Sequence, residues 1–206
     1  MNLLHLTCSP RGADSESSRL SQAIVDRLCH LHPDAQVNAR DLAASRLPHV
    51  DGDYSHALGS RQTPSDEVLS KGSLAQSEQL ISELERADYV VIGTPMHNFT
   101  VPSVLKAWID HVVRVNRTFD ITREGKVGRL RDRPVLVAVA SGGLYSGDAA
   151  RQPDFLTPYL KAILATIGLH DLRFFSVEGM AFGMEAASLA QQRTLDAVHA
   201  QLPFAA

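Results

Sequence analysis

The chain has 206 residues, of which 44% are hydrophobic and 21% charged, and its formal net charge is −3 at pH 7. These values are typical of one folded domain with a sizeable core, which we expect over residues 1–206. The small negative charge gives no electrostatic reason to expect nucleic acid or an anionic membrane as a partner. No stretch has the apolar length of a membrane-spanning helix.

The cysteine and histidine patterns exclude two further kinds of site. Two cysteines, Cys8 and Cys29, are too few for a disulfide framework. We therefore expect a reduced, cytoplasmic protein. The nine histidines are scattered, without an H-E-x-x-H motif or the Cys/His spacing of a zinc site, so no metal is expected.

Short apolar runs alternate with amphipathic segments along the chain, which predicts alternating strands and helices. Strands are expected over residues 2–6, 37–42, 89–93, 134–140 and 172–177. Helices are expected from residue 17 or 18 to about 31, and over 73–86, 103–110, 155–167 and 185–201, with Gly168 ending the fourth.

Two stretches interrupt this alternation. Residues 48–72 are rich in polar residues, Gly and Pro, and predict a long excursion, because the pattern resumes on both sides. Residues 118–128 are punctuated by Gly and predict a small hairpin or an ordered loop. Five strands alternating with five helices predict a doubly wound α/β fold with helices on both faces. The flavodoxin-like parallel strand order 2-1-3-4-5 fits this count.

The stretch from Thr94 to Pro102 joins a buried strand to a helix that Ser103 is expected to cap. Pro95 and Pro102 bracket this loop and stiffen it. In open α/β sheets, ligands bind outside the carboxyl ends of the strands. The chemistry is therefore expected at this loop.

The side chains of this loop suit a planar heteroaromatic ligand with polar edges. Met96 and Phe99 offer a soft apolar surface, and Asn98 offers an amide. Ordinary core packing of Met96 and Phe99 is the alternative. His97 is either a solvent-facing loop residue or part of a substrate pocket.

The loop after the first strand holds three hydroxyls beside the start of a helix, from Ser9, Ser15 and Ser17. Backbone N–H groups and the positive end of a helix dipole favour a phosphate there. The alternative is that Ser15 and Ser17 are only cap and turn residues.

Rival interpretations of this loop fail on spacing. It contains Gly12 but no G-x-G-x-x-G fingerprint, and no Walker A loop. A cysteine phosphatase would resemble Cys followed five residues later by Arg, but counting from Cys8 the residue in that place is Asp14. Cys8 is better interpreted as a small packing residue than as a nucleophile.

Ser141-Gly142-Gly143 follows the fourth predicted strand. Without a Cβ, Gly142 and Gly143 let the backbone approach a flat ligand closely. A Gly-Gly pair also simply makes turns. The three loops converge at one edge of the predicted sheet, where they outline a single site.

With these residues in view, the chain resembles the FMN-dependent NADH azoreductases, flavodoxin-like enzymes that also reduce quinones. The likeness covers almost the full length, and Pro-Met-x-Asn-Phe at residues 95–99 is its most specific motif. The shorter matching motifs are Cys8-Ser9-Pro10-Arg11, Ser15 to Ser21, Ala39 to Ala43, Leu105-Lys106, Ser141-Gly142-Gly143, Thr157 to Leu160 and Val177-Glu178-Gly179.

The resemblance implies a bound FMN and either NADH or NADPH as electron donor. The family passes hydride through flavin N5 to quinones or azo compounds in a ping-pong cycle. It works as a homodimer whose active sites draw on both chains, and here the Phe119 loop and the helix near Phe155 are the expected contributors. The implied cofactor-binding residues are Ser9, Ser15, Glu16, Ser17, Pro95, Met96, His97, Asn98, Phe99, Ala140, Ser141, Gly142 and Gly143.

The sequence departs from the family pattern at three places. His97 stands where a Tyr is frequent, and Glu16 replaces the usual Gln, so its side chain is expected to point away from a phosphate. Ala140-Ser141-Gly142-Gly143 replaces Ser-Arg-Gly-Gly, which removes an Arg. No side chain is expected to act as a nucleophile, and His97 is a candidate substrate contact.

Two alternatives belong to other classes. One is a non-enzymatic, flavodoxin-type electron carrier, which the modest charge of −3 disfavours. The other is a binding domain that kept the fold and lost FMN, for which Glu16 is the hint.

Overall fold

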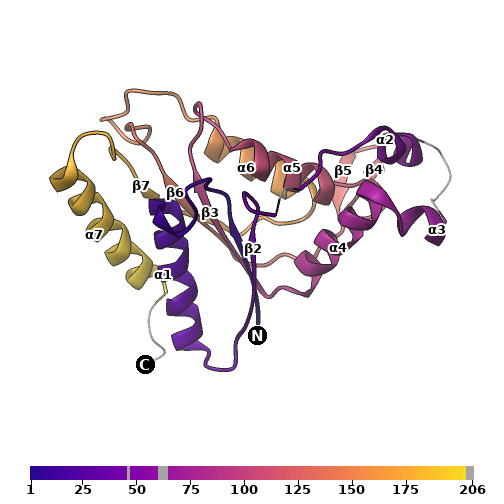
Figure 1. The fold of residues 1–206 in the computed structure, drawn as a ribbon, viewed down its shortest axis with the longest axis horizontal. Coiled ribbons are helices and arrows are strands. Elements are labelled where there is room, and N and C mark those ends of the chain that lie inside the picture. The colour runs from indigo at the N-terminus through magenta and orange to yellow at the C-terminus, as the bar shows by residue number, and fades with distance from the viewer. Residues whose placement is uncertain (46, 60–64, 203–206) are drawn as a thin grey trace.

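A five-stranded parallel sheet with the order β2-β1-β3-β6-β7 forms the centre of the molecule (Figure 1). The computed structural model describes residues 1–45, 47–59 and 65–202. The five strands are β1 (Asn2–Thr7), β2 (Gln36–Asp41), β3 (Tyr89–Pro95), β6 (Val135–Ala140) and β7 (Leu172–Val177). The predicted sheet order is confirmed, because the two intervening strands lie outside this sheet.

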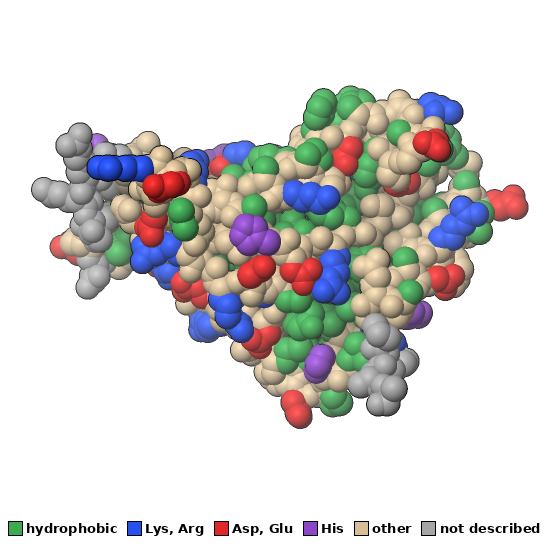
Figure 2. Space-filling model, turned by 180° about the vertical axis from the view of Figure 1, so that it is seen from behind, with side chains coloured by type: hydrophobic (Ala, Val, Ile, Leu, Met, Phe, Trp, Pro, Cys, Tyr) green, Lys and Arg blue, Asp and Glu red, His purple; other side chains and the backbone are tan. Residues whose placement is uncertain are grey.

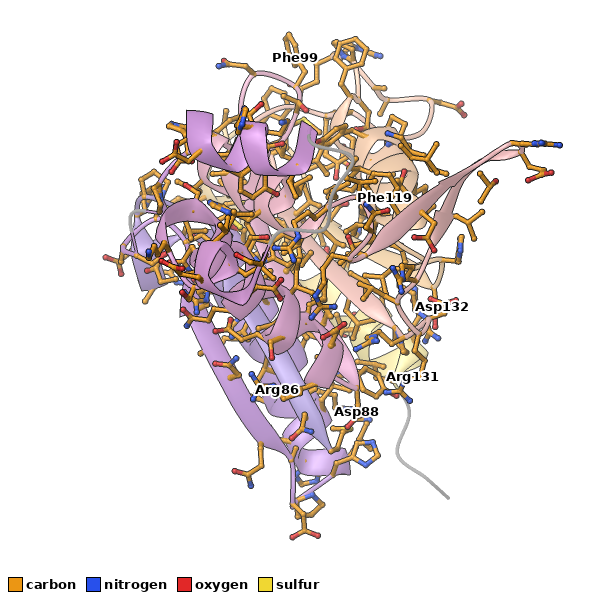
Figure 3. All side chains as sticks on the ribbon, turned by 90° about the vertical axis from the view of Figure 1, so that its right-hand side faces the viewer. Arg86, Asp88, Phe99, Phe119, Arg131 and Asp132 are labelled. Atoms are coloured by element: carbon orange, nitrogen blue, oxygen red, sulfur yellow. The ribbon has the colours of Figure 1, made fainter. Side chains whose placement is uncertain are left out.

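Those two strands, β4 (Phe119–Thr122) and β5 (Gly125–Gly128), form a separate antiparallel hairpin. Of the two alternatives expected over residues 118–128, a small hairpin or an ordered loop, the structure shows the hairpin. Phe119 lies at its base against the core, and the rest of the hairpin extends away from the body of the molecule (Figure 3).

Helices cover both faces of the sheet (Figure 1). One face carries α1 (Glu16–Leu31) and α7 (Met184–Gln201), and the other carries α4 (Gly72–Arg86), α5 (Ser103–Val112) and α6 (Leu156–Thr166). No helix of the described chain is long and apolar enough to cross a membrane. On the face drawn in Figure 2, basic and acidic side chains are interspersed.

Two hydrophobic clusters, one on each face, hold the layers together. On β1, Leu3 belongs to the same cluster as Ile24 of α1, whereas the next residue, Leu4, belongs to the cluster of Leu80 and Leu84 of α4. Successive side chains of a strand point to opposite faces, so a central strand must be apolar throughout. This is why the central strands are continuous apolar runs in the sequence.

Several element ends differ from the sequence predictions. Helix α1 begins at Glu16 with Ser15 as its N-cap, one or two residues earlier than predicted. The predicted Ser103 cap is wrong, because Pro102, with φ −62° and ψ 153°, takes the N-cap position. Strand β3 continues two residues further than predicted, because Pro95 still pairs with Ala140 of β6.

The polar excursion over residues 48–72 contains two short helices that the sequence did not predict, α2 (Gly52–Gly59) and α3 (Asp66–Leu69). Residues 60–64 of this stretch lie outside the described residues. Helix α2 is anchored by Tyr54, whose side chain is buried and whose hydroxyl donates to the carbonyl of Asp110 on α5 at 3.2 Å. A tertiary contact therefore organises a segment without a strong local pattern.

Candidate functional site

The loops that follow β1, β3 and β6 lie at the carboxyl edge of the sheet, at the top of Figure 1. These strands are direct neighbours in the order β1-β3-β6 and run parallel. The sheet therefore brings together the three loops in which the sequence placed its candidate residues.

The serines of the first loop form a hydroxyl cluster at the start of α1. Ser15 Oγ accepts the N–H of Ser18 at 3.2 Å and donates to Ser18 Oγ at 2.8 Å, and it lies 3.3 Å from Ser17 Oγ. Ser9 Oγ accepts the N–H of Arg11 at 3.2 Å. Ser15 is thus a helix cap, as one of the two interpretations held. Ser9, Ser15 and Ser17 are all buried.

The first turn of α1 also offers backbone donors. In the part of the chain that the structure describes, the N–H groups of Glu16 and Ser17 donate to no acceptor. They stand at the positive end of a 16-residue helix. An anion bound there would satisfy both donors and interact favourably with the dipole.

The Glu16 carboxylate is held by other side chains. Its Oε1 accepts from Arg19 Nη1 at 2.7 Å, and its Oε2 accepts from Gln191 Nε2 of α7 at 2.5 Å. These bonds tie the acidic group to the neighbouring helix. Its negative charge is offset by Arg19, so Glu16 does not leave an unpaired anion beside the free N–H groups.

The second loop is a tight two-residue turn with unusual backbone angles. His97 and Thr100 exchange two N–H···O bonds of 2.9 Å each, and between them Asn98 and Phe99 have φ of 47° and 70°. A positive φ is common for Asn but rare for a bulky residue such as Phe. Such strain gathers at functional sites, where the surroundings hold it in place.

Phe99 is accessible despite its strained backbone. It is 43% exposed and points outward at the end of the molecule (Figure 3). Its carbonyl accepts the N–H of Phe155 at 3.0 Å, and Phe155 is itself 59% exposed. The backbones of two residues with exposed aromatic side chains are therefore joined here.

The third loop is fixed by the segment that follows β7. The carbonyls of Ser141, Gly142 and Gly143 accept N–H groups of residues 179–181 at 3.1–3.2 Å. Among the described residues, the N–H groups of Gly142 and Gly143 have no acceptor. The loop therefore presents two free donors on a firmly held backbone.

The second and third loops are joined by backbone and side-chain bonds. The N–H of Met96 donates to the carbonyl of Ala140 at 2.8 Å. The side-chain amide of Gln152 donates to Ser141 Oγ and to Met96 Sδ, each at 3.1 Å. Sequence reasoning missed Gln152, because it lies in an irregular loop without a motif or periodicity.

Cys8 lies at the end of β1 but inside the core. It has no exposed surface and packs with Leu4 and Leu6. Burial raises the pKa of its thiol, and the nearby Asp41 carboxylate adds to this effect. The thiol is therefore not a nucleophile at neutral pH, which agrees with the packing role inferred from the sequence.

Comparison with known proteins shows which family has this fold. A family model described as a flavodoxin-like fold matches residues 1–202. The FMN-dependent NADH:quinone oxidoreductase 5 of Burkholderia lata is 50% identical over 201 residues, covering 98% of this chain and 92% of that protein. The chain belongs to this flavodoxin-like family.

Further members support the assignment. FMN-dependent NADH:quinone oxidoreductase 4 of Pseudomonas fluorescens is 49% identical, covering 98% of this chain and 93% of that protein. The crystal structure of an azoreductase from Bacillus anthracis matches with a TM-score of 0.85 and 25% identity, covering 98% of each chain. The resemblance recognised in the sequence is thereby confirmed.

Within this family, the three departures noted in the sequence have distinct surroundings. His97 is exposed on the strained turn. Glu16 is bonded to Arg19 and α7. Ser141, which stands in place of an Arg, is buried and bonded to Gln152.

Proposed function

We propose that this chain is an FMN-dependent oxidoreductase that uses NADH or NADPH to reduce quinones and the azo bond of aromatic azo compounds. The observation that carries the proposal is the set of N–H donors without a partner among the described residues, at Glu16 and Ser17 at the start of α1 and at Gly142 and Gly143 after β6. Two relatives that are 50% and 49% identical to this chain bear the name FMN-dependent NADH:quinone oxidoreductase, which supports the same assignment.

The residues present fit an FMN molecule. The phosphate is assigned to the start of α1, where the free N–H groups and the hydroxyls of Ser9, Ser15 and Ser17 gather. The ring system is assigned to residues 95–99 and 140–143, which combine the apolar Met96 and Phe99 with backbone donors. Glu16 contributes its N–H, since its carboxylate is already bonded to Arg19 and Gln191.

When bound, FMN supplies hydride transfer through N5, first from the nicotinamide and then to the acceptor, in a ping-pong cycle. The work of the chain is to bind and orient these groups and to exclude water between them. Exposed His97 and Phe99 are assigned to the contact with the acceptor. Neutral amide donors, rather than a charged side chain, polarise the bound ring.

We also propose that the protein is a cytoplasmic homodimer with its active site at the interface. Phe99 and Phe155 are exposed at the rim of the site, and Ile121 and Val127 on the hairpin are 70% and 50% exposed. The Phe119 loop is expected to reach the partner, but the Phe119 side chain is only 6% exposed and packs in its own core. Ile121 and Val127 therefore take its place as the hairpin's contribution to the interface.

The test is a titration of flavin-free protein with FMN, followed by assays with NADH or NADPH in the presence and absence of a quinone or an azo dye. We expect saturable FMN binding and nucleotide oxidation that requires an acceptor. Protein that gains no flavin absorbance contradicts the proposal and favours a domain that lost FMN. Protein that binds FMN but does not react with either nucleotide favours the electron carrier.

A further inference from the structure

We propose that Gln152 is a positioning residue of the flavin site, and that residue 143 is glycine to make room for Gln152 rather than for the cofactor. This inference rests on the proposed binding of FMN. It departs from the sequence interpretation, in which Gly143 lets a flat ligand approach the backbone.

Gln152 connects the two loops to which the ring system is assigned. Its Nε2 atom lies 3.1 Å from Ser141 Oγ, after β6, and 3.1 Å from Met96 Sδ, after β3. One amide thus sets the distance between a hydroxyl on one wall and a thioether on the other. Because β3 and β6 are adjacent strands, a change in this side chain is transmitted to both walls.

The backbone around Gln152 is itself held in place. The N–H groups of Arg151 and Gln152 both donate to the carbonyl of Leu144, at 2.8 and 3.2 Å. Glu178, after β7, accepts the N–H groups of Tyr145 and Ser146 at 2.6 and 3.1 Å. Both ends of the 144–152 loop are therefore fixed, so that the amide is pre-organised.

The side chain of Gln152 fills the space next to Gly143. A Cβ added at Gly143 would lie 2.2 Å from Gln152 Oε1 and 2.9 Å from its Cδ, closer than atoms in contact can be. At Gly142, the nearest neighbour of an added Cβ is the Ala181 Cβ at 3.7 Å, an ordinary contact. The φ of Gly143 lies outside the left-handed region, so the backbone itself tolerates alanine. The conflict is with one side chain.

Gln152 also gives the Ser141 hydroxyl an uncharged partner. The resemblance leads to an Arg where Ser141 stands, and here the Ser141 hydroxyl is instead bonded to an uncharged amide from another loop. This wall of the site is polar without carrying a charge. Its geometry depends on Gln152, because the buried Ser141 hydroxyl accepts a hydrogen bond from the Gln152 amide at 3.1 Å.

The experiment is a double-mutant cycle on FMN affinity. Flavin-free wild type, Gly143→Ala, Gln152→Ala and the double variant are titrated with FMN, and the absorption spectrum of the bound flavin is recorded for each. We expect Gln152→Ala to weaken binding about threefold to tenfold and to shift the spectrum, as for the loss of one or two neutral hydrogen bonds. In the wild-type background, Gly143→Ala should weaken FMN binding by a similar factor. In the Gln152→Ala background, it should have little further effect.

Two further variants sharpen the test. Gln152→Leu keeps the size of the side chain but donates no hydrogen bond, and should behave as Gln152→Ala does. Gln192→Leu is the matched control, because Gln192 is exposed on α7 and, among the described residues, its side chain bonds only Asp196. It should leave FMN affinity and the spectrum unchanged.

Two results would overturn the inference. Equal weakening by Gly143→Ala in both backgrounds would mean that the glycine serves the cofactor directly. Wild-type affinity and spectrum in Gln152→Leu would mean that its hydrogen bonds position nothing. Absence of FMN binding by the wild type is a separate outcome, which overturns the proposed function together with this inference. Circular dichroism checks that each variant folds. If Gly143→Ala does not fold, the Gln152 variants alone decide whether Gln152 positions the flavin site.

Discussion

At the scale of single residues, Phe99 combines a backbone that its residue type disfavours with a side chain that is largely accessible. Its φ of 70° is in the left-handed region, and its side chain is 43% exposed. Neither feature stabilises a folded monomer. A strained, exposed aromatic residue at the carboxyl edge of a sheet is typical of a ligand contact.

We predict that Phe99→Gly separates stability from function. Glycine adopts this φ without strain, so the free energy of unfolding should stay within about 1 kcal/mol of the wild-type value or rise. The KM for a quinone should rise about tenfold, as for the loss of a favourable aromatic contact. Urea denaturation and steady-state kinetics measure the two effects.

A stability loss of several kcal/mol with unchanged KM would show that Phe99 is a packing residue. Phe99→Leu is the control that keeps the backbone strain.

At the scale of elements, the N-terminus of α1 is both a capped helix end and a candidate phosphate site. The Ser15 hydroxyl is already used within the helix cap, where it accepts the N–H of Ser18. Ser9 and Ser17 are therefore the hydroxyls to vary, since the cap can survive their loss.

The double variant Ser9→Ala/Ser17→Ala should bind FMN more weakly, because hydrogen bonds to charged groups contribute about 1.5–3 kcal/mol each. We expect affinity to fall by at least about a hundredfold in a fluorescence titration. Ser70→Ala is a matched control, since Ser70 is exposed and, within the described part of the chain, its hydroxyl bonds only the carbonyl of Glu67. Unchanged affinity in the double variant would place the phosphate elsewhere.

The packing of α1 on β1 has a consequence for pH dependence. His5 of β1 is 4% exposed, and its Nε2 lies 2.9 Å from Ser21 Oγ of α1. Burial lowers the pKa of His5 below its ordinary value of 6.5, although the Asp26 carboxylate opposes part of this effect. Below pH 6.5 the unfolded chain therefore binds a proton that the folded chain resists, so this group makes stability fall as pH decreases.

We predict that His5→Gln reduces the loss of stability between pH 7.5 and pH 5. The free energy of unfolding, measured with urea at both values, should decline less in the variant than in the wild type. His56→Gln, at an exposed position on α2, should decline like the wild type. An equal decline in all three proteins would show that His5 does not contribute to the pH dependence.

At the scale of the whole molecule, exposed apolar side chains on the hairpin and at the rim of the site argue for a second copy of the chain. We predict that Ile121→Asp weakens the dimer at least tenfold in sedimentation or light-scattering measurements, because a buried charge without a partner is costly at an interface. Monomer stability should change little, since Ile121 is 70% exposed. Val68→Asp, at a 43% exposed position on α3, is the control. A monomeric wild type would contradict the dimer.

Much of this architecture follows from local sequence. Apolar runs marked four strands of the sheet, weak alternation marked β2, and helical periodicity marked the five long helices, because these patterns are set by near neighbours in the chain. The strand order followed from general rules on parallel sheets. Helix α2 escaped prediction because its anchor, Tyr54, is buried by α5, which is distant in the sequence.

The sequence by itself determined which residue types stand at the carboxyl edge of the sheet, since motifs and strand ends are local features. Only the tertiary structure decided how those residues are used. Gln191 holds Glu16 from 175 residues away, and Gln152 holds Met96 from 56 residues away. Such contacts depend on how whole elements pack, and no spacing or periodicity in the chain encodes them.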